Sequence, residues 1–173
     1  MQFLRKITVC FLTLAALLLS ACGGSGAAGS FGAKDISLRV NGEAVTAELS
    51  PEAILGLLGD GYDYAEAVSC VYEGMDKTYT YPEAVLYTYS DAEGEHLMEL
   101  YCSGGDVKTS RGIGLGASRE DVVAAYGEPT SEFGITLSYE LEAEGDMIPA
   151  SLYFELRGGA VTAISIVAEH RGE

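Results

Sequence analysis

The sequence contains no tryptophan, two histidines and only ten lysine or arginine residues, against 26 aspartate and glutamate residues. Its net charge of −16 repels phosphate, which excludes a protein that binds nucleic acid through clustered basic side chains. His96 and His170 belong to no HExxH motif, and neither a paired CxxC nor a nucleophile elbow is present. We therefore expect no nucleic-acid partner, no metal, no cofactor and no catalytic residue, although residues far apart in the sequence can still converge into a site.

Two short stretches bear a partial likeness to ligand-binding loops. The glycines of GIGLG (112–116) alternate and do not fit the GxGxxG pattern of dinucleotide loops. The stretch SDAEGE (90–95) lacks the spaced acidic ligands and the closing glutamate of a calcium loop. We expect a turn at each position.

The N-terminus has the pattern of an export signal. Arg5 and Lys6 precede an apolar run at 7–19, which is too short to span a bilayer comfortably, and LSAC (19–22) follows. LSAC resembles the lipobox of bacterial lipoproteins. That resemblance implies a signal peptide of residues 1–21, cleavage before Cys22, and acylation of Cys22 as the mature N-terminus. The alternative is an ordinary secretory signal cleaved nearby.

If Cys22 is acylated, two acyl chains hold the protein stably at the extracytoplasmic face of the bacterial cell membrane. Residues 22–33, rich in glycine, serine and alanine, then form a flexible tether, and residues 34–173 form a single domain. Cleavage removes Arg5 and Lys6, so that eight basic residues remain against 26 acidic ones, a balance of −18. This acidity favours either a cationic partner or simple solubility.

A helix pattern occurs twice. SPEAILGLLGD (50–60) and SREDVVAAYGE (118–128) each place a serine at the N-cap, an acidic residue in the first turn and a glycine at the end. Their apolar residues form one stripe along each helix. We therefore predict two short helices, each with one buried face.

The similarity continues beyond the helices. EAVSCVYE (66–73) matches FGITLSYE (133–140), AVLYTY (84–89) matches ASLYFE (150–155), and LMELYC (97–102) matches AISIVA (163–168). We interpret the domain as an α+β fold of two tandem repeats, about 34–109 and 110–173. Each repeat is a short helix followed by about three antiparallel strands. A leading hairpin with a type I′ turn at Asn41-Gly42 adds further strands.

Alternation along the predicted strands assigns side chains to the two faces of the sheet. One parity, expected to face the helices, contains Leu86, Met98, Leu100, Cys102, Leu152, Ile164, Ile166 and Ala168. The other parity contains Tyr87, Tyr89, Tyr101 and Tyr153.

The duplicated unit with GLGASREDVVAAYGEP (114–129) resembles the β-lactamase-inhibitor-protein-like fold and the small lipoproteins of outer-membrane assembly. SCVYEGMDKTYTY (69–81) and TSRGIGLGASREDVVAAYG (109–127) are also similar to uncharacterised surface lipoproteins of Gram-positive anaerobes. The resemblance implies a continuous curved sheet with helices on one face, in a protein that binds other proteins and catalyses nothing. It carries over no inhibitory residue, so β-lactamase inhibition is not predicted.

The eleven tyrosines give a positive indication of function. We expect six of them to line the sheet face away from the helices and to form a partner-binding surface: Tyr79, Tyr81, Tyr87, Tyr89, Tyr101 and Tyr153. The alternative is that they form cross-strand pairs that stabilise a half-exposed sheet.

Cys70 and Cys102, both on the inward parity, form either a disulfide or two buried free thiols. A strand lying between them favours the free thiols, because it separates the two residues by more than a disulfide can span.

Three functions remain: a protein-binding module, a structural or envelope-assembly lipoprotein, and, last, a small-molecule carrier or enzyme.

Overall fold

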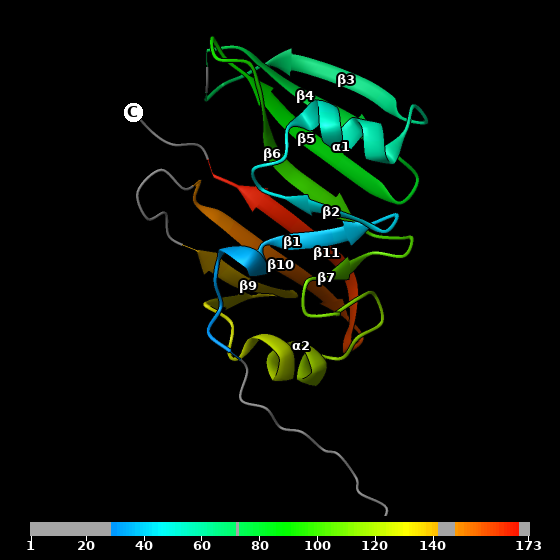
Figure 1. Cartoon of the computed structure of the whole chain (residues 1–173), viewed down its shortest axis with the longest axis vertical. Helices are drawn as coiled ribbons and strands as arrows, with labels where there is room; N and C mark the ends of the chain where they lie inside the picture. The colour runs from blue at the N-terminus through cyan, green and yellow to red at the C-terminus, as the bar shows by residue number, and fades with distance from the viewer. Residues whose placement is uncertain (1–28, 72, 142–147, 170–173) are drawn as a thin grey trace, which may run out of the picture.

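The computed structural model describes residues 29–71, 73–141 and 148–169 (Figure 1). The signal segment, Cys22, Tyr72 and His170 lie outside these residues. The described chain begins with a short 3-10 helix, Ala33–Asp35, and contains two α-helices, α1 (Pro51–Leu58) and α2 (Arg119–Tyr126). Its strands are β1 (Ser37–Val40), β2 (Glu43–Thr46), β3 (Asp63–Val68), β4 (Met75–Thr80), β5 (Ala84–Ser90), β6 (Glu95–Cys102), β7 (Lys108–Thr109), β8 (Ser131–Phe133), β9 (Thr136–Leu141), β10 (Ala150–Arg157) and β11 (Ala160–Ala168).

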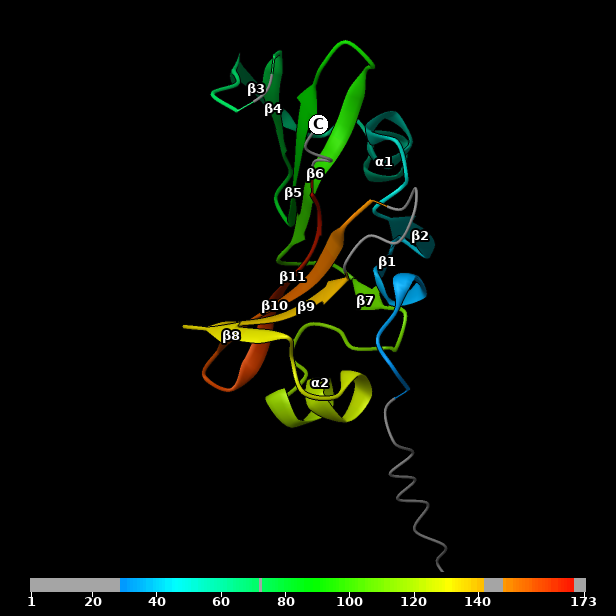
Figure 2. The ribbon, with the colours of Figure 1, turned by 90° about the vertical axis from the view of Figure 1, so that its left-hand side faces the viewer.

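Eight strands form one antiparallel sheet in the order β3-β4-β5-β6-β11-β10-β9-β8. The strands β3–β6, which follow α1, make one half of this large sheet, and β8–β11, which follow α2, make the other. β6 pairs with β11 at the centre. Figure 2 shows the sheet bowed, with its edge strands β3 and β8 displaced toward the same side. Both helices and the small sheet lie on the opposite side, so the large sheet is concave on its other face.

The two helices begin and end where their sequences predict. The hydroxyl oxygens of Ser50 and Ser118 accept hydrogen bonds from the N–H groups of the third helical residues. Ser118 and Asp121 complete a capping box. Gly59 and Gly127 follow the helices with φ of 84°, a conformation that favours glycine. These local signals are sufficient to place both helices.

The hydrophobic core lies between the large sheet and the layer of helices and small sheet. Leu86, Leu100, Leu152, Ile164 and Ile166 are fully buried there, as their strand parity predicts. From the helices, Ile54 and Val122 are fully buried in the same core. The packing of these apolar faces stabilises helices that would be marginal in isolation.

The leading hairpin has the predicted turn, with Asn41 at φ 52° and Gly42 at φ 88°. It does not extend the large sheet. Instead β1 and β2 join β7 in a separate three-stranded sheet of order β2-β1-β7, which lies between α1 and α2 in Figure 1. Leu38 and Val45 of this small sheet are fully buried in the core, because this hairpin covers the middle of the large sheet rather than its edge.

Three details of the strands differ from the sequence prediction. Each half of the large sheet has four strands rather than three. The segment 66–73, predicted as one strand, contains the end of β3 and part of the connection to β4, where Ser69 N–H bonds the Gly74 carbonyl. Met98 is half-buried, and Leu97 takes the buried position. The reason is a bulge in the β5–β6 pairing beside Tyr87 and Thr88, which breaks the two-residue alternation.

The chain is thus α+β, a largely antiparallel structure with two α-helices among the described residues. At eight residues each, α1 and α2 fall well short of the length that a membrane-crossing helix needs, and no other described helix reaches it.

Candidate binding face

Tyr101 and Tyr153 lie on the face of the large sheet opposite the helices, on either side of Ser165. Ser165 of β11 is directly opposite Tyr101 of β6 and also directly opposite Tyr153 of β10. The neighbouring residues Leu100 and Leu152 point into the core, so the two tyrosines point away from it. We call this side of the sheet the tyrosine face.

The floor of the tyrosine face consists of small residues. Ser138, Ser151, Ala163 and Ser165 alternate with core residues along β9, β10 and β11, yet each is at most 6% exposed. Larger neighbours in the adjacent strands cover them, and Tyr101 and Tyr153 are accordingly half-buried. The tyrosines and their neighbours therefore cover the small residues of the sheet and leave no deep cleft among Ser138, Ser151, Ala163 and Ser165.

Two carboxylates accompany these tyrosines. Glu99 precedes Tyr101 by two residues and interacts with the Ser165 hydroxyl, while Glu155 accepts a hydrogen bond from Tyr101. Burial and the charge of Glu155 raise the pKa of Glu99, and burial and Glu155 also raise the pKa of Tyr101. The tyrosine face is acidic at its centre.

Tyr87 and Tyr89 extend this surface along β5. Tyr87 is half-buried and lies opposite Glu99. Tyr89 is buried, and its ring stacks on His96 with 5.0 Å between centroids and 24° between planes. Beside it, Asp76 of β4 adds a third carboxylate, whose Oδ1 is buried without a hydrogen-bond donor among the described residues. Four of the six predicted tyrosines therefore share the tyrosine face.

The prediction for Tyr79 and Tyr81 was wrong. Tyr79 is buried on the helix side, and its hydroxyl donates to Glu95 Oε1 at 3.0 Å. Tyr81 packs against the core, and its hydroxyl donates to the carbonyl of Gly59, the residue that ends α1, at 2.7 Å. Both rings contact Tyr62 edge-on. The reason is that β4 begins at Met75, after the predicted strand 66–73, so the alternation predicted for that segment does not assign the faces of β4.

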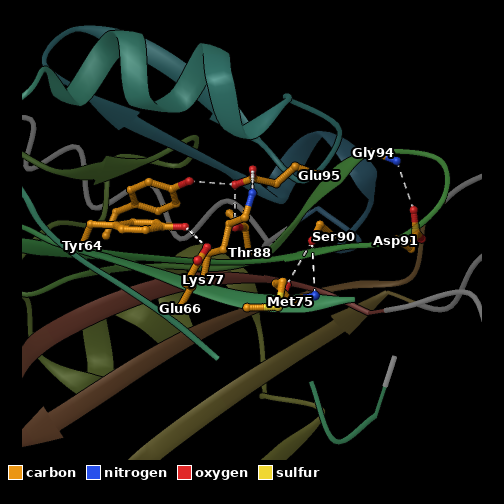
Figure 3. A network of polar contacts seen from close by, with 10 residues as sticks. Tyr64, Glu66, Met75, Lys77, Thr88, Ser90, Asp91, Gly94 and Glu95 are labelled. Carbon is orange, nitrogen blue, oxygen red and sulfur yellow. Dashed lines mark hydrogen bonds and ion pairs between the residues drawn. The ribbon is translucent and has the colours of Figure 1, made fainter. Parts of the chain in front are cut away.

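Glu95 is the centre of a polar network on the helix side (Figure 3). It accepts hydrogen bonds from Lys77 at 2.5 Å, Thr88 at 2.7 Å and Tyr79 at 3.0 Å. Burial alone would raise the pKa of Glu95, but these three donors outweigh it and hold the pKa below its usual value. The bulge turns the Glu95 carboxylate toward the helix side, where it satisfies the hydroxyl of Thr88, which is fully buried.

The edge of this network lies closer to solvent. Tyr64 of β3, 49% exposed, donates to Glu66, and this hydrogen bond is the main cause that raises the pKa of Tyr64 to about 12. At the other end, Asp91 accepts from the Gly94 N–H and closes the β5–β6 turn, as predicted for this segment (Figure 3). Each of these groups has a structural hydrogen bond, so the network is best described as a support for the sheet.

The two cysteines are both free thiols. Cys102 is buried as predicted, and burial raises its pKa to about 12. Cys70 is exposed, contrary to the prediction, because it lies in the connection between β3 and β4 rather than within a strand. Cys102 borders a cavity of about 250 Å³ that Leu58, Tyr81 and Val107 also line. An open hollow of about 570 Å³ lies beside Lys34, Asp35 and Arg111.

Sequence reasoning missed Glu99, Glu155 and Arg111. The two glutamates share the parity of Tyr101 and Tyr153, so the same alternation could have placed them. Arg111 carried no local signal, because its partner Asp35 precedes it by 76 residues.

Within residues 29–71, 73–141 and 148–169, no three His, Cys, Asp or Glu side chains gather as a metal-ion cluster. Comparison of the chain with protein-family models, with curated proteins and with solved structures gives no match.

Proposed function

We propose that this protein is a lipoprotein anchored at the extracytoplasmic face of the bacterial membrane, and that its tyrosine face binds another protein without catalysing a reaction. The observation that carries the proposal is the Tyr101–Ser165–Tyr153 row, which lies on the side of the sheet opposite both helices. Tyrosine offers a large contact area with a polar tip and few rotatable bonds, which suits recognition of a protein surface.

The shape of the tyrosine face favours a protein over a small molecule. Small ligands bind in clefts that enclose most of their surface. Here the floor residues Ser151, Ala163 and Ser165 are already buried by their neighbours. The sheet is bowed over its whole width, with β3 and β8 at its rims (Figure 2). Such a broad and shallow concave surface matches a convex protein surface.

The charge of the tyrosine face indicates the chemistry of the partner. Asp76, Glu99 and Glu155 lie on it, whereas Arg157 at its end is an exposed cation beside Glu155. Lysine or arginine side chains of a partner would meet both carboxylates and aromatic rings there. We therefore propose a partner with a basic contact surface, rather than attributing the acidity to solubility alone.

We also propose that the domain arose by duplication of a helix-plus-meander unit. The sheet order supports this, since α1 precedes β3–β6 and α2 precedes β8–β11. One row across the sheet has a tyrosine at each end and four aliphatic residues between them: Tyr79, Leu86, Leu100, Ile166, Leu152 and Tyr139. In addition, Tyr81 and Tyr139 donate to Gly59 and Gly127, the equivalent terminal glycines of the two helices.

The anchor is tested in cells that produce the full chain. We expect labelled palmitate to be incorporated into the parent chain and lost in Cys22→Ser. A parent chain that carries no label, or label that persists in Cys22→Ser, would contradict the proposed lipid anchor.

The binding face is tested by photo-cross-linking on intact cells. A photoreactive amino acid at Tyr153 should give one cross-linked protein, whereas the same residue at Glu52, on the exposed side of α1, should not. The cross-link should disappear on adding Tyr101→Ser and persist with Tyr64→Ser, a tyrosine on the opposite face. Equal cross-linking from Tyr153 and Glu52 would exclude the tyrosine face as the binding surface.

A structural or envelope-assembly role is the second candidate. It is favoured by the half-burial of Tyr101 and Tyr153, which cover the small residues of the sheet. If this role is correct, deletion of the protein changes envelope integrity, while Tyr101→Ser and Tyr153→Ser lower only the stability of the domain.

A further inference from the structure

Arg111, between β7 and α2, fastens the N-terminal segment of the described chain to the domain. Its Nε and Nη2 atoms bind the two carboxylate oxygens of Asp35 at 2.8 and 2.6 Å. Nη1 donates to the carbonyls of Gly29 and Ala125 at 2.9 and 2.7 Å, and Nη2 donates to that of Ser30 at 2.9 Å. All five guanidinium N–H donors therefore have an acceptor, and Arg111 has none left for a ligand in the adjoining hollow.

The ion pair at this position is well shielded from solvent. The side chain of Asp35 is 3% exposed and that of Arg111 is 17% exposed. The Gly32 N–H also donates to Asp35 Oδ2 at 2.9 Å, and the guanidinium carbon of Arg111 lies 4.9 Å from the ring centroid of Tyr126. Burial alone would raise the pKa of Asp35, but the hydrogen bonds from Arg111 and Gly32 outweigh it and keep the pKa below its usual value.

Phe31 adds an apolar contact to the same segment. Its ring centroid lies 5.7 Å from that of Tyr139 and 6.1 Å from that of Tyr126, and the side chain packs against the core. Residues 29–33, which the sequence assigned to the tether, thus contact the domain. We call residues 29–35 the N-terminal strap.

We infer that the N-terminal strap makes the α2 end of the domain the end that faces the lipid bilayer. This inference rests on the proposed anchor at Cys22. Seven residues lead from Cys22 to Gly29, and fully extended they span at most about 25 Å. Arg111 holds Gly29 and Ser30 of the strap and also donates to the carbonyl of Ala125 in α2. The C-terminal end of α2 must therefore remain within about that distance of the anchor plus the width of the Arg111 side chain.

The opposite end of the molecule is then directed away from the membrane. Figures 1 and 2 place α2 and the start of the strap at one end of the long axis, and β3, β4 and the β5–β6 turn at the other. The tyrosine face runs along the side of this axis. It is therefore presented sideways, where it can reach a neighbouring envelope protein without pressing against the bilayer.

Without the strap, the anchor would hold the domain only at Ile36, its first buried apolar residue. Fourteen residues separate Cys22 from Ile36 and span up to about 50 Å, enough for the domain to turn over. The Arg111 contacts halve this reach, and this is how they select one orientation.

The orientation is measurable on vesicles. The mature chain with Cys70→Ser, which removes the exposed thiol, is coupled through Cys22 to maleimide lipids in phosphatidylcholine vesicles. A donor dye is attached to an azide-bearing amino acid at Ala124 in α2, or in a separate sample at Glu93 in the β5–β6 turn. We expect stronger energy transfer to acceptor lipids from Ala124 than from Glu93.

The difference between the two positions should be lost in the double variant Arg111→Met and Asp35→Asn, which releases the strap without leaving a buried charge. It should persist in Arg119→Met, since Arg119 makes an exposed ion pair with Glu132 at the same end. A Gly/Ser segment inserted between residues 28 and 29 keeps the Arg111 contacts intact and should also abolish the difference, so the test does not depend on the double variant folding.

Equal transfer from both positions in the parent chain overturns the inference, as does a difference that survives both strap release and tether insertion. Coupling at Cys22 is chemical in this experiment, so its result is independent of acylation in cells. Loss of the proposed anchor is detected separately by the palmitate experiment.

Discussion

Leu100 on β6 and Ile166 on β11 lie directly opposite each other at the centre of the large sheet, and both are fully buried. Leu86 is the next partner of Leu100, and Leu152 is the next partner of Ile166. Ile166 follows Leu100 by 66 positions, and Leu152 follows Leu86 by the same number. The proposed duplication therefore places its symmetry axis between Leu100 and Ile166.

Because these two side chains share one region of the core, we expect truncating either to weaken the fold strongly. Leu100→Ala and Ile166→Ala should each lower the free energy of unfolding by about 2–5 kcal/mol, as measured by urea denaturation. The double variant should cost less than the sum, since the second truncation enlarges a cavity that already exists. Val167→Ala, half-buried on the tyrosine face, is the control and should cost less than either. If the loss of unfolding free energy in the double variant equalled the sum of the two single losses, the two side chains would not share one region of the core.

Glu95 and Glu99 lie on the same strand and should affect stability in opposite directions. The folded-state pKa of Glu95 is lowered from 4.5, so its ionised form stabilises the fold above about pH 4.5 and loses this effect as the pH falls through the folded-state pKa. Glu95→Gln should lower the free energy of unfolding by about 1–2 kcal/mol at pH 7 and flatten its acid dependence.

The folded-state pKa of Glu99 is raised, so its ionised form destabilises the fold at pH 7. Glu99→Gln should therefore stabilise the protein at pH 7, and this gain should vanish at a pH below the unfolded value, where both states are protonated. Chemical denaturation between pH 3 and pH 8 measures both variants. Parallel pH profiles for the two variants would exclude the assigned directions.

Substitutions of Gly127, which follows α2, and of Gly56, within α1, should distinguish the cost of backbone strain from the cost of packing. Gly127 has φ of 84° and no atom within 4 Å of an added Cβ, so Gly127→Ala meets only the backbone cost, about 1–2 kcal/mol of destabilisation. Gly56 lies within α1 with equally open surroundings, and Gly56→Ala should stabilise the protein by about 0.5–1 kcal/mol. Thermal unfolding of the two variants should therefore shift in opposite directions.

The two thiols should differ in reactivity. In a chain of residues 22–173 with Cys22→Ser, Cys70 and Cys102 are the two remaining thiols. Iodoacetamide at pH 8 should modify exposed Cys70 rapidly and leave buried Cys102 unmodified, because the thiolate is the reactive form and burial raises the Cys102 pKa to about 12. Mass spectrometry of the native protein should show one adduct, and unfolding in urea should add the second. Rapid modification of both in the native state would contradict the burial of Cys102.

The parts of the structure that could be predicted depend on residues close together in the sequence. Ser118, Asp121 and Gly127 set the limits of α2 through hydrogen bonds and a φ angle that lie within ten positions. The Asn41-Gly42 turn is equally local. Such interactions leave the same pattern in any fold, so they could be read without knowing the partners of the helix or hairpin.

The candidate site was predictable only where strand alternation held without interruption. Tyr101 and Tyr153 were assigned to the correct face, since no irregularity lies between them and the core residues Leu100 and Leu152. Tyr79 was assigned to the wrong face, because the preceding hairpin connection had been interpreted as part of a strand. The predicted burial of Met98 was wrong for a related reason, because the bulge shifts the alternation of β6 by one residue.

The sequence by itself determined the two helices, the I′ turn and the alternation that separates the central core residues from the tyrosines, because short-range hydrogen bonding and periodic burial encode them. Only the tertiary structure decided that the leading hairpin joins β7 in a second sheet, that Glu95 gathers Lys77, Tyr79 and Thr88, and that Arg111 holds Asp35. These contacts join residues that are distant in the sequence, and their energy depends on burial that exists only once the chain has folded.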